Sequence, residues 1–260
     1  MSRARARRDE FAAGGRPACV PVSASAGERG AAGFLSLVAS RAERWLLEPA
    51  PPRPRAAEPP PDARPVVAVI GLGPRCGTTT IARALAIELA RRDRSGAAIV
   101  SACNRGPAPA LATAAARRLA RALPREAASA AGRLCLLDPD DAAIRELALS
   151  RPAPLVLDVE HGRPPQGPFA LADAAVLVAG VAIEPALADV VAASLTRGGL
   201  APLIVLNRAA ELSAWSERDV LMIGEARLGA RLALAGRDPT PGLARPIGQL
   251  ADALVGEEVA

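Results

Sequence analysis

A short segment rich in glycine and threonine holds the residue types best suited to chemistry in this chain. It reads Gly71-Leu72-Gly73-Pro74-Arg75-Cys76-Gly77-Thr78-Thr79-Thr80. An apolar run at 66–70 precedes it, and apolar residues at helical spacing follow it. In such a strand-to-helix turn, backbone N–H groups and the helix dipole both attract a phosphate. The segment therefore predicts an anion-binding loop, and the alternative is a tight turn without a ligand.

The loop partly matches the Walker A phosphate-binding motif, G-x-x-x-x-G-K-[ST]. Gly77 takes the place of the second glycine, and Thr79 takes the place of the hydroxyl that binds Mg²⁺. However, Thr78 stands where the motif has lysine and Leu72 stands where it has the first glycine. The match indicates a phosphate cradle that lacks the usual cation.

The composition removes several chemistries at once. The chain contains no lysine, so all 32 basic residues are arginine, and its one histidine is His161. Schiff-base lysines, a phosphate-loop lysine and metal sites built on several histidines are therefore excluded. The cysteines lack the close spacing of a zinc site, and nothing indicates disulfides, so we expect a reducing, cytoplasmic setting. They are Cys19, Cys76, Cys103 and Cys135.

Apolar runs alternate with segments of helical periodicity along most of the chain. The runs lie at 66–70, 97–101, 133–137, 154–157, 174–179 and 202–206, with a weaker one at 220–223. The helical segments lie at 79–92, 106–121, 184–196, 225–234 and 244–255. This alternation is typical of a parallel sheet with helices on both faces. We therefore predict a doubly wound α/β domain at 66–256 with a mostly parallel sheet of about seven strands.

The first 65 residues differ in composition from the rest. Residues 1–32 are rich in Arg and Ala and predict a disordered tail, and 33–47 predict a short amphipathic helix. Residues 48–65 are rich in proline and predict a stiff linker. The arginine surplus of the tail suggests non-specific contact with nucleic acid or an anionic membrane surface. No uncharged stretch approaches the ~20 residues of a membrane span.

An ordered set of segments resembles the ParA/MinD-like, deviant Walker A (SIMIBI-class) P-loop ATPases over roughly 66–256. The loop end Gly77-Thr78-Thr79-Thr80 and the helix after it resemble the opening of that family's P-loop helix. Four further segments resemble its acidic strand, its next strand, its base-contacting strand and its closing helix: 154–162, 171–178, 203–208 and 246–254. The resemblance implies a P-loop NTPase-like fold that binds ATP or ADP with Mg²⁺.

The resemblance also assigns roles to residues. Thr79 and Asp158 would hold Mg²⁺, and Asn207 would contact adenine. The residues expected to bind the nucleotide are Gly73, Arg75, Cys76, Gly77, Thr78, Thr79, Thr80 and Asn207. If this interpretation holds, Thr79 and Asp158 must approach one Mg²⁺-sized site. Protein partners of a ParA/MinD-type system, and a homodimer, are implied as well.

The departures from the family lie where hydrolysis would occur. Gly73 and Thr78 occupy the places of the family's two lysines, and the second strand ends without an acid. Phosphoryl transfer depends on positioned positive charge and an oriented nucleophile, so we assign no catalytic residue and expect ATP hydrolysis to be weak or absent. The sequence then suggests a pseudo-ATPase scaffold or regulator in a partitioning, division-site, pilus or secretion system. Alternatively, a partner activates a weak Mg-ATPase in which Arg75 and Thr79 hold the phosphates.

A third interpretation is an NADP-binding Rossmann oxidoreductase. Gly71 and Gly73 match G-x-G, and Arg105 follows the second strand, where an arginine can meet a 2′-phosphate. Against this interpretation, Cys76 stands in place of the third glycine, and the chain has neither Tyr nor Lys for proton transfer. In that case Gly71 and Arg105 would line one long groove.

Overall fold

The computed structural model describes residues 64–101, 111–123, 128–138, 141–159, 170–211, 213–240 and 242–256. The expected tail (1–32), amphipathic helix (33–47) and most of the linker (48–65) lie outside these residues, as do His161 and Arg105. Within the described residues, no helix combines the length and apolar character needed to cross a bilayer.

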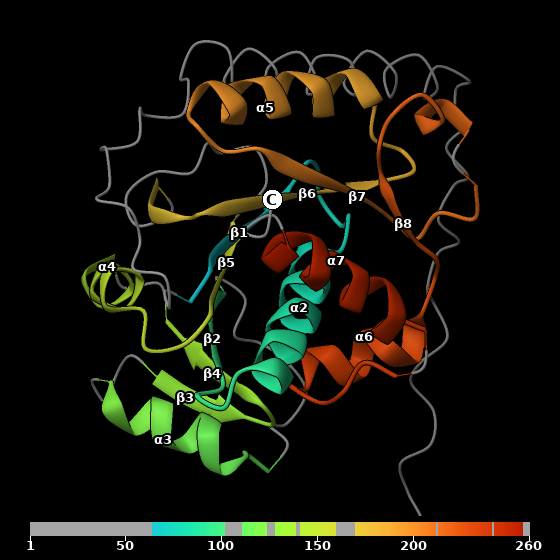
Figure 1. The fold of residues 1–260 in the computed structure, drawn as a ribbon. Coiled ribbons are helices and arrows are strands. Elements are labelled where there is room, and N and C mark those ends of the chain that lie inside the picture. The colour runs from blue at the N-terminus through green and yellow to red at the C-terminus, as the bar shows by residue number, and fades with distance from the viewer. Residues whose placement is uncertain are drawn as a thin grey trace, which may run out of the picture. The chain divides into compact units, whose positions relative to one another are not determined.

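One sheet of eight strands organises the domain, in the order β3-β4-β2-β5-β1-β6-β7-β8 (Figure 1). The strands are β1 (Val66–Gly71), β2 (Ala97–Ser101), β3 (Ala128–Ala131), β4 (Leu134–Leu137), β5 (Leu155–Val159), β6 (Ala174–Gly180), β7 (Pro202–Asn207) and β8 (Leu221–Ile223). All neighbouring pairs are parallel except β3 with β4. The predicted doubly wound α/β class is therefore confirmed.

The structure adds one strand to the seven apolar runs of the sequence. The missing strand, β3, pairs antiparallel with β4 at the edge of the sheet. Its sequence, Ala-Ser-Ala-Ala, has neither the bulk nor the apolar alternation that marks a strand. Its strand conformation therefore depends on pairing with β4, which no local pattern of β3 encodes.

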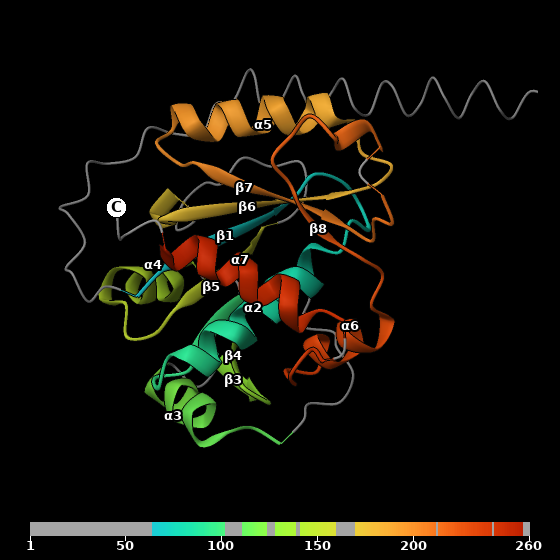
Figure 2. The ribbon, with the colours of Figure 1, turned by 45° about the vertical axis from the view of Figure 1, so that its right-hand side comes forward.

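Helices cover both faces of the sheet (Figure 2). They are α2 (Thr78–Arg92), α3 (Ala114–Ala122), α4 (Asp141–Ser150), α5 (Pro185–Arg197), α6 (Arg227–Leu234) and α7 (Ala244–Gly256), with a short 3-10 turn, η2 (Ser213–Trp215). The apolar sides of α2, α6 and α7 join one buried cluster, and those of α4 and α5 join a second cluster on the opposite face.

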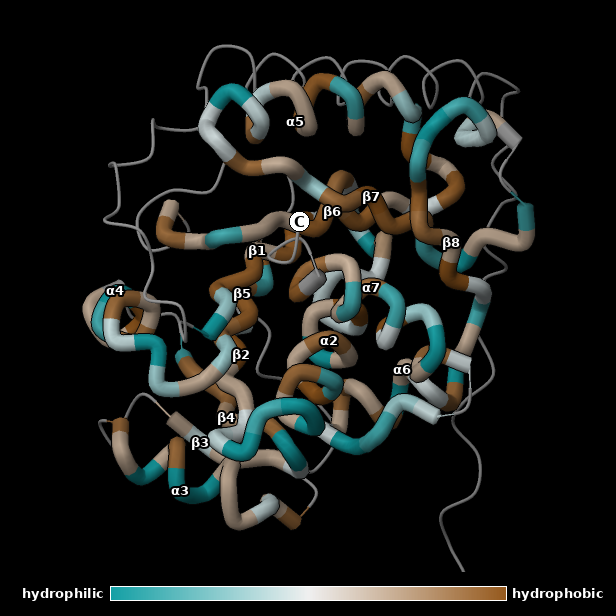
Figure 3. The backbone as a smooth tube through the Cα atoms, viewed as in Figure 1, coloured by the Kyte–Doolittle hydropathy of each residue, from teal (hydrophilic) through white to brown (hydrophobic). Residues whose placement is uncertain are grey.

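The central strands explain this two-sided packing. Along β1, Val67 and Val69 face the α2 side, whereas Val66, Ala68 and Ile70 face the other. Because both faces are buried, the strands read as continuous apolar runs, which Figure 3 shows in brown. In such a sheet, the loops that follow the carboxyl ends of the strands lie together at one end, and ligands of doubly wound folds bind there.

Candidate functional site

The glycine- and threonine-rich loop lies at the carboxyl end of the sheet, after the central strand β1. Its first residue ends β1, which is flanked by β5 and β6, and its last three residues form the first turn of α2. The Leu72 N–H donates to the Val178 carbonyl at 3.0 Å, which ties the start of the loop to β6. The loop thus has the strand-to-helix context that a phosphate cradle requires.

The turn into α2 depends on Gly77. Its φ of +92° lies in the left-handed region, and it occupies the N-cap position of α2 without any side-chain cap. With no capping side chain, the first N–H groups of α2 remain available for an anion. A Cβ at this position would lie 2.2 Å from Asn207 Nδ2, so the site also has no room for a side chain.

Asn207 holds the loop from the far side. The residue ends β7 and is only 5% exposed, and its Nδ2 donates to the Cys76 carbonyl at 2.8 Å. The resemblance assigned Asn207 to adenine. The structure places its amide against the loop backbone, where it fixes the loop's shape.

Cys76 and Thr78 contact one another inside the loop. The Cys76 Sγ lies 3.0 Å from Thr78 Oγ1, and the thiol is buried. Thr78 stands where the Walker A motif has its lysine. At this position the chain therefore offers a hydroxyl, which contacts the Cys76 thiol, and no positive charge.

Thr79 and Asp158 approach each other across the loop. Asp158 lies on β5, opposite Val69 of β1, and its carboxylate accepts hydrogen bonds from the hydroxyls of Thr79 and Ser101. The Ser101 bond measures 2.9 Å and joins neighbouring residues on β2 and β5. This arrangement brings together the two residues expected to hold Mg²⁺.

A buried arginine completes the surroundings of Asp158. Arg83 is 2% exposed, lies one helical turn after Thr79 on α2, and donates to the Leu234 carbonyl at the end of α6. Burial raises the pKa of Asp158, while the bonds from Thr79 and Ser101 and the positive charge of Arg83 oppose that rise. Sequence reasoning did not identify Ser101 or Arg83 as part of the site. The signal in the sequence that could have identified Arg83 was its i, i+4 spacing from Thr79.

The residues present suit Mg²⁺ in its usual protein setting. Magnesium prefers oxygen ligands and is bound by one or two carboxylates together with substrate phosphates. Thr79 supplies a hydroxyl and Asp158 a carboxylate, beside a loop shaped for phosphate. Among the described residues, no group of three or more His, Cys, Asp or Glu side chains forms a separate metal site.

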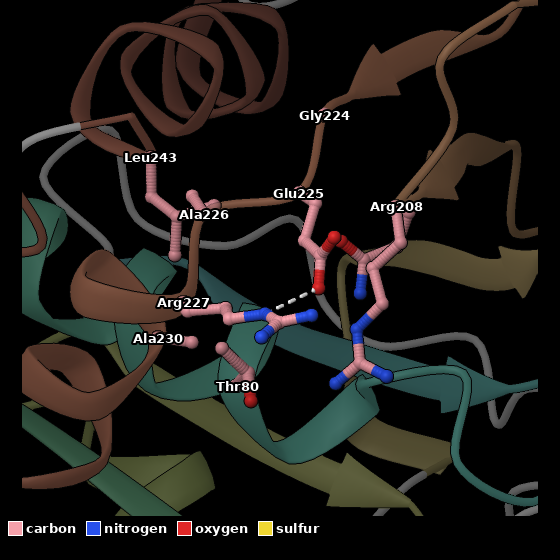
Figure 4. A pocket seen from close by; sticks show the side chains of 9 residues that line it. Thr80, Arg208, Gly224, Glu225, Ala226, Arg227, Ala230 and Leu243 are labelled. Carbon is pink, nitrogen blue, oxygen red and sulfur yellow. Dashed lines mark hydrogen bonds and ion pairs between the residues drawn. The ribbon is translucent and has the colours of Figure 1, made fainter.

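A hollow of about 200 Å³ lies next to the loop (Figure 4). It is lined by Thr80, Asn207, Arg208, Gly224, Glu225, Ala226, Arg227, Ala230 and Leu243. These residues come from the start of α2, the end of β7, the segment after β8, α6 and the turn before α7. Of this set, sequence reasoning had identified Thr80 and Asn207 alone. The hollow therefore adjoins both the start of α2 and Asn207, the residue that bonds to the loop.

Arg75 is exposed at the tip of the loop and has a φ of +59°. A left-handed φ is strained for any residue with a Cβ, and glycine avoids that strain. We therefore expect Arg75→Gly to be more stable to urea than Arg75→Ala by about 1 kcal/mol, although both lose the guanidinium. Equal unfolding free energies for the two variants would contradict this assignment of strain.

Comparison with known proteins agrees with this fold. No protein-family model and no curated protein matches the chain. Among solved structures, MinD of Aquifex aeolicus superposes with a TM-score of 0.53 at 17% identity, covering 75% of this chain and 98% of that one. A ParA family ATPase of Chlorobium tepidum gives 0.50 at 15%, covering 73% and 99%. A putative plasmid partition protein of Borrelia burgdorferi bound to AMPPNP gives 0.50 at 9%, covering 76% and 100%. The chain therefore has a ParA/MinD-like P-loop fold.

Proposed function

We propose that this chain is a nucleotide-binding P-loop protein that hydrolyses ATP weakly or not at all. On this proposal it acts as a scaffold or regulator in a partitioning, division-site, pilus or secretion system. The observation that carries the proposal is the approach of Thr79 to Asp158 beside a glycine-bearing loop without a lysine. The solved structures named above include MinD and a putative plasmid partition protein, which supports this choice of system.

On this proposal the loop and α2 bind the phosphates. Backbone N–H groups at the loop and at the start of α2 donate to the phosphate oxygens, and the helix dipole adds a partial positive charge. Arg75, exposed on the loop, provides a guanidinium whose fork suits a phosphate. Thr79 and Asp158 hold Mg²⁺, which when bound offsets the negative charge of the phosphates.

The same geometry accounts for weak hydrolysis. The chain has no lysine that could contact the phosphates, and β2 ends at Ser101 without an acid. Ser101 is already bonded to Asp158. Losing comparable transition-state contacts typically costs a factor of about 10²–10⁵ in rate, so binding would persist where turnover does not.

A titration of the full chain with nucleotides tests the proposal. We expect calorimetry to show ADP or ATP binding that strengthens with Mg²⁺. Thr79→Ala and Asp158→Asn should each weaken the Mg²⁺-dependent affinity about tenfold or more, because the first removes a hydroxyl ligand and the second removes the negative charge of the carboxylate. The exposed residues Thr196 and Asp219 provide matched controls, and Thr196→Ala and Asp219→Asn should bind as the wild type does.

Three outcomes would count against this proposal. Absence of binding to any nucleotide would leave the loop as a strand-to-helix turn without a ligand. Tight NADPH binding that ignores Mg²⁺ and survives Asp158→Asn would instead favour the dinucleotide-binding alternative. Nucleotide binding with a turnover that rises on adding a partner protein would favour the weak, partner-activated ATPase.

A further inference from the structure

The exposed side of α3 gathers three arginines around one alanine. Ala114, Arg117, Arg118 and Arg121 recur at helical spacing, so they share one side of the helix, and all four are exposed. They line an open cavity of about 230 Å³. Figure 1 shows α3 beside β3 and β4, at the opposite end of the strand order from β8. This surface, the arginine face, is therefore separate from the phosphate loop and from the hollow beside it.

No carboxylate pairs with the arginine face. Residues 94–125 contain no Asp or Glu, but they contain arginine at positions 94, 105, 117, 118, 121 and 125. Within the part of the chain that the structure describes, Arg117, Arg118 and Arg121 form no ion pair. Like charges at i, i+3 and i, i+4 spacing repel one another and destabilise a helix. An anionic partner would offset this repulsion, because a guanidinium donates two parallel hydrogen bonds to one carboxylate.

The helix that carries the arginine face is fixed to the rest of the domain. Ala116 and Leu119, on its other side, are buried. Thr113 caps the helix, since its Oγ1 accepts from the Ala116 N–H at 3.3 Å. The Thr113 N–H in turn donates to the Gly132 carbonyl of the β3–β4 turn at 2.8 Å. A helix that is already fixed loses little conformational freedom when a partner binds, which favours affinity.

An exposed leucine lies beside the arginine face and indicates which kind of anion fits it. Leu111 is 98% exposed, and it precedes Ala114 by three residues, so their Cα atoms are at most about 11 Å apart. The backbone of a nucleic acid presents phosphates and sugars, which leave a leucine unburied. A protein segment presents carboxylates and apolar side chains together, and protein interfaces are enriched in arginine.

A membrane surface fits less well than a protein segment. Helices that lie in the membrane interface bury their apolar side among the lipids. The apolar side of α3 is already packed against the sheet through Leu119, so only its charged side is available.

We infer that the arginine face binds an acidic segment of a partner protein. Carboxylates of the segment pair with Arg117, Arg118 and Arg121, and an apolar side chain of the segment packs on Leu111. Complementary charge speeds the encounter and fixes the orientation of the segment, and the apolar contact adds buried area. This inference goes beyond the proposed nucleotide binding and does not depend on it.

Fluorescence anisotropy on the full chain tests the inference with a labelled peptide that repeats the unit Glu-Glu-Leu. The triple variant Arg117→Gln, Arg118→Gln, Arg121→Gln should bind this peptide about tenfold or more weakly than the wild type. Leu111→Ser keeps every charge and should weaken peptide binding about threefold or more, because it removes the apolar contact.

A second triple variant supplies the matched control. Arg145→Gln, Arg231→Gln and Arg237→Gln remove three exposed arginines elsewhere in the domain, so the two triple variants have the same net charge. Both variants keep the arginine-rich N-terminal segment, so non-specific attraction to it is equal in the two. The control should bind the peptide within about twofold of the wild type, since lone surface charges contribute little.

Several results would overturn the inference. These are absence of peptide binding by the wild type, equal peptide affinities for the two triple variants, and peptide binding that Leu111→Ser leaves unchanged. A DNA duplex or a phosphatidylserine vesicle that loses binding to the α3 variant, while the peptide keeps its affinity, would instead assign the arginine face to that polyanion. The α3 variant should titrate with nucleotide as the wild type does, so a failure of nucleotide binding is a separate result.

Discussion

Gly77→Ala is expected to lower the free energy of unfolding by about 3 kcal/mol. The glycine has a φ of +92°, which costs a residue with a Cβ about 1 kcal/mol. The new methyl group would also lie 2.2 Å from Asn207 Nδ2, and relieving that collision moves a buried amide off the Cys76 carbonyl. Breaking a buried hydrogen bond costs a further ~1–3 kcal/mol. Urea unfolding of the wild type and the variant measures the difference.

A double-mutant cycle with Asn207→Ala identifies the source of the loss. The single change Asn207→Ala removes the bond to Cys76 and should itself cost about 1–3 kcal/mol. In that background the collision is already gone, so adding Gly77→Ala should cost only the ~1 kcal/mol of backbone strain. The two changes should therefore be non-additive by about 2 kcal/mol. Strict additivity would show that Asn207 does not hold the loop.

The strands and helices of the domain could be predicted because the local spacing of apolar residues indicates which side chains are buried. The runs at 66–70 and 202–206 are apolar throughout since both faces of the sheet are covered. Ile81 and Leu85 recur at helical spacing, and both are fully buried residues of α2. What the patterns missed, β3, is an edge strand made of small residues, whose conformation depends on its neighbour β4.

The site could be predicted only where one segment carries its own signal. Thr79 follows a glycine-rich loop and Asp158 ends an apolar run, so both were identified, and the structure brings them together. Ser101 joins them through the register of β2 on β5. That register is a property of the assembled sheet, and no single segment of the sequence encodes it.

The hollow shows the same limit. Glu225 and Arg227 lie in a segment after a weak strand, and nothing near them in sequence resembles a binding motif. They become relevant because β8 pairs with β7 and delivers its carboxyl end next to Asn207. Long-range pairing therefore creates the hollow beside the loop, whereas the glycine- and threonine-rich loop itself is local and visible in the sequence.

Gly236→Ala is expected to be strongly destabilising, although Gly236 lies outside the loop. Gly236 follows α6 with a φ of +72°, and a Cβ there would lie 2.2 Å from the Ala131 carbonyl oxygen. Its own carbonyl accepts from the Arg133 N–H at 2.9 Å, so the two chain segments are already held in contact. The obstacle is backbone, and no side-chain rotation relieves it. We expect a loss of about 3 kcal/mol, from backbone strain and overpacking together.

Gly248→Ala supplies the matched control for the same chemical change. Gly248 lies inside α7, and its added Cβ would meet only the end of the Arg92 side chain, at 3.9 Å. Alanine in a helix interior is favoured over glycine by roughly 0.5–1 kcal/mol, so this variant should be more stable than the wild type. By thermal unfolding, the melting temperature of Gly236→Ala should fall by roughly 6–12 °C and that of Gly248→Ala should rise. An unchanged melting temperature for Gly236→Ala would contradict this prediction. It would mean that the β3–β4 turn does not pack against the end of α6.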